Sequence, residues 1–393
     1  MQPLEGITVL DLNRRYPGAF SAMILGDFGA NVIKVDAPGA TVNLPDAGDT
    51  MSERFAAFYA LDRNKRSIVV NLKKDRGLEV FLRLVEKSDV LIEGFRPGVM
   101  GRLGVGYSRL SELNPRLVYC ALTGYGQAGP YAAIPGHDMN YVAIAGALSM
   151  IGPRGGAPCF PSHYLGDLAG AGLHGTIAVL LALAARERTG RGQYVDLAYL
   201  DGVMSLLTME ATAYFITGEV PRRGETALTG GYPLAQVLKC SDGRYFTVAC
   251  FEHQFWVNLC KAIGREDLTA YDSPGDPAQR DWAIAELQKV FITKARDEWW
   301  EFLRPLNTCV APVLDYDEAC ENEQVRARDM VLEFDHPKFG RIRQIGIVAK
   351  LSDTPGSVRS LGTPAGESTD EVLSWLGYGT DDIAGLRRDA AVA

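Results

Sequence analysis

Hydrophobic and polar positions alternate in regular blocks along the first third of the chain. Short apolar runs predict buried strands, and two stretches with apolar residues at helical spacing predict helices. The predicted strands are residues 7–12, 31–35, 66–72, 90–93 and 117–123, and the predicted helices are residues 20–28 and 77–87. Because strands alternate with helices, we expect an open, mostly parallel α/β sheet.

The remaining two thirds of the chain follow this pattern less closely. The sequence predicts a long helix over residues 168–188, a strand over 193–198, a hairpin over 239–249 and a terminal helix over 371–377. The hairpin turn is expected at Asp242-Gly243, a pair of residues that favours tight hairpin turns. Residues 218–233 are rich in Gly, Pro and charge, which indicates a crossing between domains, and residues 352–368 resemble an extended surface segment.

Composition excludes several classes of protein. The 393 residues are enough for two or three domains, and the net charge of −8 disfavours nucleic acid as a partner. Seven Cys without a Cys-x-x-Cys pair indicate buried thiols in a reducing compartment, so we expect a cytoplasmic protein. We find no signal peptide and no apolar run close to the ~18 residues of a membrane span, and therefore expect no membrane partner.

Two titratable residues stand beside glycines, between segments that are otherwise apolar. His137 lies in Pro-Gly-His-Asp-Met-Asn-Tyr, and Asp167 lies in Tyr-Leu-Gly-Asp-Leu-Ala-Gly. An imidazole and a carboxylate that face each other could remove a proton from one side of a carbon and return it to the other. Each residue also has a structural interpretation, because Asp167 could cap the following helix and His137 could be a hydrogen-bonded structural residue.

Other motifs give weaker signals. Residues 124–129 match G-x-G-x-x-G, but Pro130 follows at once and no helical pattern opens there, so we do not expect a dinucleotide site. Asp36 stands at the end of the second predicted strand, where dinucleotide-binding proteins carry a ribose-binding acid, but the preceding turn at residues 13–18 lacks their glycine pattern. No His, Cys or carboxylate spacing predicts a metal site, and no Gly-x-Ser-x-Gly motif is present.

Basic residues occur in two loops beside predicted strands. Arg63, Lys65 and Arg66 form one group, and Arg96 follows the strand at residues 90–93. Either group could simply be solvated surface. Alternatively, they could bind a phosphate-rich ligand, since open α/β sheets bind ligands beyond the carboxyl ends of their strands.

Together these motifs resemble the class III CoA-transferase superfamily (the CaiB/BaiF type), and within it the α-methylacyl-CoA racemases. The resemblance runs from about Leu4 to Gly264 and less clearly to the C-terminus. It is carried by several blocks in a fixed order. These blocks are residues 17–23, 27–34, 89–98, 123–130, 136–141, 166–167 and 190–196.

The resemblance implies roles for individual residues. His137 and Asp167 match the two acid/base residues of the racemases, and Glu252 matches a glutamate that pairs with the histidine. In the transferases of the superfamily, the aspartate at the position of Asp167 is instead a nucleophile that carries CoA as a thioester. The expected CoA-binding residues are Arg63, Lys65, Arg66, Arg96 and Asp138.

The resemblance also implies the architecture. We expect a large Rossmann-like α/β domain over residues 1–215, a smaller α+β domain over 216–330 and a segment over 331–393 that returns to the large domain. An interlocked homodimer is expected, with no cofactor beyond the CoA moiety of the substrate. The small residues from Ala169 to Gly172 should let a ligand approach the N–H groups that begin the long helix.

Two departures from the racemases bear on the substrate. Arg14, Arg15 and Tyr16 would narrow or polarise an acyl pocket, and Ala37 stands where racemases often carry a basic residue. The sequence predicts a racemase of 2-methyl or otherwise α-substituted acyl-CoA thioesters. The alternatives are a class III CoA-transferase, another isomerase or lyase acting on CoA thioesters, and a CoA-binding protein without turnover.

Overall fold

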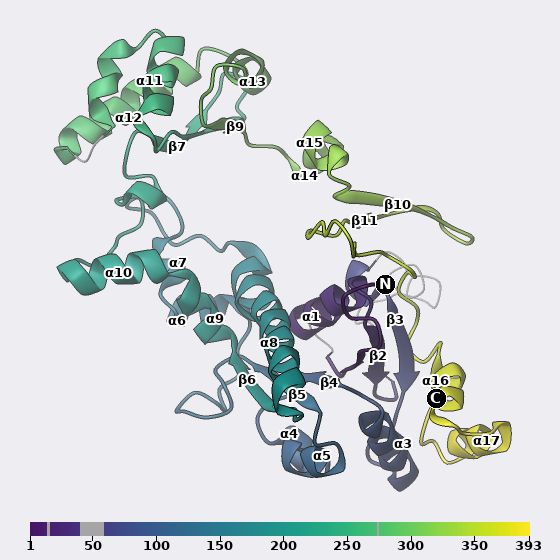
Figure 1. The fold of residues 1–393 in the computed structure, drawn as a ribbon. Helices are drawn as coiled ribbons and strands as arrows, with labels where there is room; N and C mark the ends of the chain where they lie inside the picture. Colours follow the sequence, from purple (N-terminus) through teal and green to yellow (C-terminus); the bar gives the residue numbers. More distant parts are fainter. Residues whose placement is uncertain (14–15, 40–58, 273–274) are drawn as a thin grey trace. The chain divides into compact units, whose positions relative to one another are not determined.

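The computed structural model describes residues 1–13, 16–39, 59–272 and 275–393. The chain divides into two compact units. Figure 1 colours the chain from its N-terminus to its C-terminus, so that the segments of each unit can be followed. Unit 1 comprises Met1–Ala145, Ser162–Leu206 and Glu323–Ala393. Unit 2 comprises Gly146–Pro161 and Leu207–Asn322.

Unit 1 is built on a six-stranded parallel sheet with the strand order β3-β2-β1-β4-β5-β6. The strands are β1 (Thr8–Asp11), β2 (Asn31–Asp36), β3 (Lys65–Val69), β4 (Val90–Glu93), β5 (Val118–Thr123) and β6 (Tyr194–Ala198). The predicted open, parallel α/β sheet is therefore confirmed. The strand order reverses at β1 and β4, which is the kind of switch point where such sheets bind ligands.

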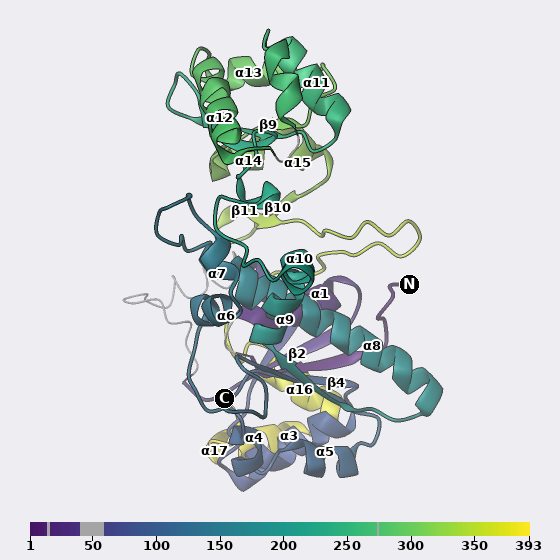
Figure 2. The ribbon, with the colours of Figure 1, turned by 90° about the vertical axis from the view of Figure 1, so that its left-hand side faces the viewer.

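Helices cover both faces of this sheet because side chains alternate along each strand. Val9 packs with residues of α1 (Tyr16–Asp27) and α8 (His174–Thr189), whereas its neighbour Leu10 packs on the opposite face. The helices on the Leu10 face are α3 (Asp75–Glu86), α5 (Tyr107–Leu113), α16 (Thr369–Leu376) and α17 (Thr380–Arg388). Figure 2 shows α1 and α8 above the strands and α3, α5 and α16 below them. The C-terminal segment thus completes the core of unit 1.

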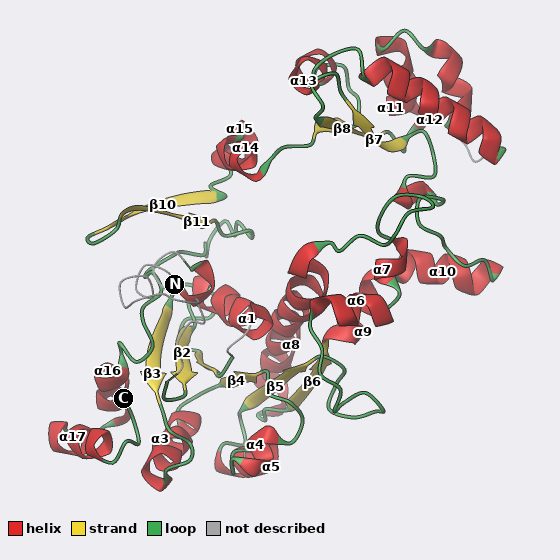
Figure 3. Cartoon of the chain, turned by 180° about the vertical axis from the view of Figure 1, so that it is seen from behind, coloured by secondary structure: helices red, strands yellow, loops and turns green. Residues whose placement is uncertain are grey.

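Unit 2 contains a three-stranded antiparallel sheet with the order β7-β8-β9. Its elements include β7 (Ala235–Lys239), β8 (Tyr245–Ala249), β9 (Val310–Pro312), α7 (Ala147–Met150), α10 (Thr208–Thr217), α11 (His253–Ala262), α12 (Pro277–Phe291), α13 (Arg296–Leu303) and α14 (Tyr316–Glu321). Figure 3 shows α11 and α12 beside β7 and β8. Trp256, Phe246 and Trp299 are buried in the core between these helices and strands. Gly243 has φ +81°, so the glycine of the predicted hairpin turn adopts the left-handed conformation that such a turn needs.

Two features differ from the sequence predictions. The antiparallel hairpin of β10 (Val331–His336) and β11 (Gly340–Ile345) in unit 1 was not predicted. In addition, the helical run Ser162–Thr189 is long and apolar enough to cross a membrane by length and composition. Most of this run was predicted as the helix over residues 168–188, but no apolar run of membrane-spanning length was expected, since Asp167 and His174 stand among its small and apolar residues. A core helix of a soluble protein passes the same test, so the run is weak evidence for a membrane span.

Candidate active site

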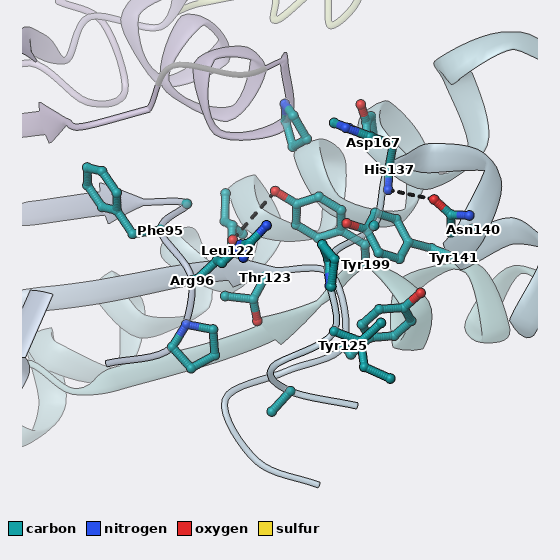
Figure 4. Close-up of a pocket in the computed structure, with 18 of the residues that line it drawn as sticks. Phe95, Arg96, Leu122, Thr123, Tyr125, His137, Asn140, Tyr141, Asp167 and Tyr199 are labelled. Atoms are coloured by element: carbon teal, nitrogen blue, oxygen red, sulfur yellow. Dashed lines mark hydrogen bonds between the residues drawn. The ribbon is translucent and has the colours of Figure 1, made fainter. Parts of the chain in front are cut away.

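A cavity of about 470 Å³ lies at the carboxyl edge of the parallel sheet in unit 1. Residues at or just after the carboxyl ends of three neighbouring strands line its wall. Arg96 follows β4, Thr123 is the last residue of β5, and Tyr199 follows β6 directly as the first residue of α9 (Tyr199–Leu206). His137 and Asp167 line the same cavity, as Figure 4 shows. The fold thus brings together two residues that are 30 positions apart in the sequence.

His137 stands immediately before α6 (Asp138–Ile144) in extended backbone, with φ −132° and ψ 174°. Its N–H donates to the side-chain oxygen of Asn140 at 3.0 Å, and its carbonyl accepts the N–H of Asn140 at 2.8 Å. These two bonds fix the entry into α6. The side chain of His137 is exposed at the cavity.

Asp138 has an unexpected part in the site. Its Oδ2 accepts the backbone N–H groups of both Gly166 and Asp167, each at 2.8 Å. The residue is only 4% exposed, and its Oδ1 has no hydrogen-bond partner in the described chain. A Cβ on Gly166 would lie 3.0 Å from Oδ2, so glycine suits this close approach. Asp138 was predicted as a CoA-binding residue, but here its carboxylate joins the two segments that carry His137 and Asp167.

Asp167 lies in the first turn of the π-helical segment η3 (Leu165–Leu173), whereas the N-cap position belongs to Tyr164. The structural interpretation of Asp167 as a helix cap is therefore wrong. The side chain is half-buried and lines the cavity. A carboxylate in this position can act on a bound ligand either as a base or as a nucleophile.

The small residues that follow Asp167 serve packing. A Cβ on Gly170 would lie 2.9 Å from the carbonyl oxygen of Leu165 and 3.0 Å from the Val203 side chain in α9. A Cβ on Gly172 would lie 2.8 Å from the Phe20 ring in α1. These glycines let η3 contact its neighbouring helices, so the expectation that they admit a ligand to the helix start is not met at Gly170 and Gly172.

Three tyrosines form a connected group in the wall of the cavity. The ring of Tyr141 meets the rings of Tyr125 and Tyr199 edge-on, with centroids 5.1 and 5.2 Å apart. Burial raises the pKa of Tyr141, and the nearby Asp167 carboxylate raises this pKa further. The same two causes raise the pKa of Tyr199, whose hydroxyl donates to the Leu122 carbonyl at 3.5 Å. Both hydroxyls therefore stay protonated and can donate hydrogen bonds.

The predicted CoA-binding cations have different locations. Arg96 is exposed and lines the cavity. Arg63 is 1% exposed and pairs with Asp27 at 2.6 Å, and Lys65 is 5% exposed and pairs with Asp11 at 2.7 Å.

Arg66 pairs with Glu371 at 2.7 Å and also donates to the side chain of Asn31. The charges of Arg63, Lys65 and Arg66 are thus used within the fold, and only Arg96 of the four predicted cations reaches the cavity.

Other predicted site residues lie elsewhere or outside the described chain. Glu252 belongs to unit 2, where it is exposed and precedes α11 as its N-cap. Arg14 and Arg15 lie outside the described residues, whereas Tyr16 lines the cavity and stacks on His163 with centroids 5.0 Å apart. In the parts of the chain that the structure describes, no group of three His, Cys, Asp or Glu could hold a metal ion.

Sequence reasoning did not assign a role to Thr123, Tyr141 or Tyr199. Thr123 is 6% exposed, and its hydroxyl has no partner among the described residues. The position of Thr123 and Tyr199 in the sequence could have indicated a role in ligand binding, because both stand at the carboxyl ends of consecutive strands. Tyr141 stands four residues after His137 in the same motif, which places it one helical turn further along.

Comparisons with known proteins agree on one family. A family model described as CoA-transferase family III matches residues 4–369. The chain is 34% identical to the alpha-methylacyl-CoA racemase of Homo sapiens, over 99% of this chain and 97% of that protein. It is 36% identical to the beta subunit of the succinyl-CoA–L-malate CoA-transferase of Chloroflexus aurantiacus, over 98% and 97%. The crystal structure of a CAIB/BAIF family protein from Brucella suis superposes with a TM-score of 0.82 at 28% identity, covering 95% of this chain and 99% of that one.

Proposed function

Because the chain belongs to CoA-transferase family III, we propose that it is a racemase of 2-methyl or otherwise α-substituted acyl-CoA thioesters. The observation that carries this proposal is that His137 and Asp167 line one cavity. A second support is that Asp138 ties the two segments together, which limits changes in their spacing. Two-base proton transfer needs such a fixed pair of groups around one carbon.

In the proposed reaction, the substrate lies with its α-carbon between the two groups. One of them takes the α-proton, and the electron pair of the C–H bond moves into the thioester, which becomes an enolate. The other group then returns a proton to the opposite face of the carbon. General acid–base catalysis of this kind contributes about 10²–10⁴-fold. The enolate also requires hydrogen-bond donors that face its oxygen.

Further residues take supporting roles in this proposal. Arg96 binds the phosphates of the CoA moiety, which is the sole cofactor that the reaction needs. Glu252 is assigned as a further catalytic residue, by analogy with the glutamate of the racemases. The protein acts as a homodimer in a reducing, cytoplasmic compartment. Exposed apolar side chains on α8 support the dimer, since Ile177, Leu180 and Leu181 are 52%, 41% and 66% exposed in the single chain.

A second candidate function is CoA transfer between a thioester and a free carboxylic acid. Here the Asp167 carboxylate attacks the thioester carbonyl and the C–S bond breaks, which gives a mixed anhydride and a CoA thiolate. The thiolate then attacks the Asp167 carbonyl and releases the acyl group as a free carboxylate, so that CoA is carried as a thioester on Asp167. The half-burial of Asp167 in the cavity suits this role as well. Transferases are also as similar to this chain as the racemases are, at 36% against 34% identity. His137 favours racemisation, because the transfer reaction needs no second base at the α-carbon.

One experiment separates these functions. The protein is incubated in D₂O with a single enantiomer of a 2-methylacyl-CoA, with and without a free carboxylic acid, and the products are followed by mass and optical purity. Deuterium at the α-carbon together with loss of optical purity supports the racemase. CoA on the added acid without α-exchange supports the transferase. Binding without either reaction would contradict both.

A further inference from the structure

The Tyr141 side chain is held firmly, yet its hydroxyl forms no hydrogen bond to the residues that the structure describes. The residue is 5% exposed, and two aromatic rings contact its ring edge-on. Backbone packs against it as well, because a Cβ on Gly124 would lie 2.3 Å from the ring and a Cβ on Gly136 would lie 2.7 Å from it. The ring therefore has little freedom to turn or to withdraw.

The hydroxyl of this fixed ring makes no hydrogen bond within the described residues. The hydroxyl is not one of the buried polar atoms that lack a partner in the described chain, so it is open to the cavity, where water or a ligand can accept its hydrogen bond. Tyr141 lines the cavity together with Asp167, and the Asp167 carboxylate is the charge that acts most strongly on its hydroxyl. The hydroxyl is thus a prepared donor in the part of the cavity where the proposed chemistry occurs.

The oxygen of the proposed enolate requires a hydrogen-bond donor in this cavity. The N–H groups of Gly166 and Asp167 would be natural donors to an oxyanion at the start of η3, but both already donate to the Asp138 carboxylate at 2.8 Å. A donor engaged by a carboxylate has less capacity left for a second acceptor. Tyr141 follows His137 by four residues and so lies one turn along the helix that His137 begins.

We propose that the Tyr141 hydroxyl donates a hydrogen bond to the carbonyl oxygen of the bound thioester and stabilises the negative charge that develops there. When His137 or Asp167 takes the α-proton, the electron pair passes from the C–H bond to this oxygen. Tyr141 keeps its own proton throughout, because burial and Asp167 both favour the neutral phenol. This inference rests on the proposed function, and it assigns a further catalytic residue to the same site.

The test is Tyr141→Phe, which keeps the ring and its packing and removes only the hydroxyl. We expect kcat for α-deuterium exchange to fall about 10²–10³-fold, as when one oxyanion donor is removed, with little change in KM. The melting temperature should stay that of the wild type. Tyr107→Phe is the matched control, since Tyr107 packs on Tyr119 and Tyr194 outside this cavity.

A binding measurement tests the inference without turnover. The ligands are an acyl-CoA thioester and the corresponding S-alkyl-CoA thioether, which lacks the carbonyl oxygen. The wild type should bind the thioester up to about tenfold more tightly than the thioether, and Tyr141→Phe should lose this preference. An unchanged preference together with wild-type kcat would overturn the inference.

Two other outcomes are also informative. If Tyr141→Phe shifts the pH profile of kcat but reaches the wild-type maximum, the hydroxyl acts on Asp167 rather than on the thioester, and the inference is overturned. If the wild type itself neither exchanges deuterium nor transfers CoA, the proposed function fails. The thioester-to-thioether ratio then still decides whether Tyr141 contacts the carbonyl oxygen.

Discussion

The Asp138 carboxylate accepts the backbone N–H of Asp167 at 2.8 Å, so the residue that follows His137 holds the residue that faces it in the proposed reaction. The same oxygen accepts the N–H of Gly166 at 2.8 Å. These bonds connect segments that are 28 and 29 residues apart in the chain. The two catalytic candidates are therefore positioned by one buried carboxylate as well as by the sheet beneath them.

Asp138→Ala should lower both stability and activity. It leaves two backbone N–H groups without their acceptor, and hydrogen bonds to a charged group are each worth about 1.5–3 kcal/mol. We expect a loss of a few kcal/mol in the free energy of unfolding and a fall in kcat larger than the change in KM. Asp138→Asn retains an acceptor oxygen and should recover most of the stability. Equal denaturant midpoints for the wild type and Asp138→Ala would contradict this role.

Much of the fold could be predicted because buried apolar strands alternate with helices along the first part of the sequence. Val9 and Leu10 are both apolar and pack on opposite faces of the sheet, which is why this run could be recognised as a buried strand. The β10–β11 hairpin escaped detection, since its strands are exposed or half-buried along most of their length and lack a buried apolar run.

The site was predicted less completely, since sequence does not show which charges are already paired. Arg63 and Lys65 resembled phosphate ligands, but Asp27 and Asp11 neutralise them from 36 and 54 residues away. The only sequence signal for Tyr141 was its position four residues after His137, because the glycines and rings that hold its side chain come from other parts of the sequence. His137 and Asp167 could be found since each stands beside a glycine in an apolar context.

Removal of either proposed base should separate exchange from racemisation. We expect His137→Ala and Asp167→Ala each to lower racemisation by at least about 10²-fold with the fold intact, since one general acid–base group is lost. Each variant should still exchange the α-proton of the enantiomer that faces the remaining base. The measurement is deuterium uptake from each pure enantiomer. Wild-type racemisation by either variant would rule out the two-base assignment.

Arg96→Ala should weaken CoA binding. Arg96 is an exposed cation that lines the cavity, and a charge-assisted hydrogen bond to phosphate is worth about 1.5–3 kcal/mol, or roughly 10–100-fold in Kd. The loss should shrink at high salt because solvent-exposed charges are screened. Calorimetric titration with CoA at two salt concentrations measures both effects. Arg83→Ala, on the exposed side of α3, serves as the control, and an equal loss in both variants would argue against a specific role for Arg96.

A second cavity of about 240 Å³ in unit 1 shares Arg96 with the first and contains a buried carboxyl group. Glu93, the last residue of β4, is 4% exposed and accepts the N–H of Phe95 at 2.6 Å. The Tyr119 hydroxyl donates to its other oxygen at 3.4 Å. Burial outweighs these two bonds and raises the pKa of Glu93 to about 7. A group with this pKa changes its charge within the physiological range.

Glu93→Gln should therefore remove a pH dependence of stability. Below the ordinary glutamate pKa of 4.5, both the folded and the unfolded chain carry the proton. As pH rises towards 7, the unfolded chain releases it first, so the folded state loses up to about 3 kcal/mol relative to Glu93→Gln. Urea unfolding of both proteins between pH 4.5 and 8 measures this difference, which should grow with pH and level off above 7. A difference that stays constant across this range would show that Glu93 ionises normally in the fold.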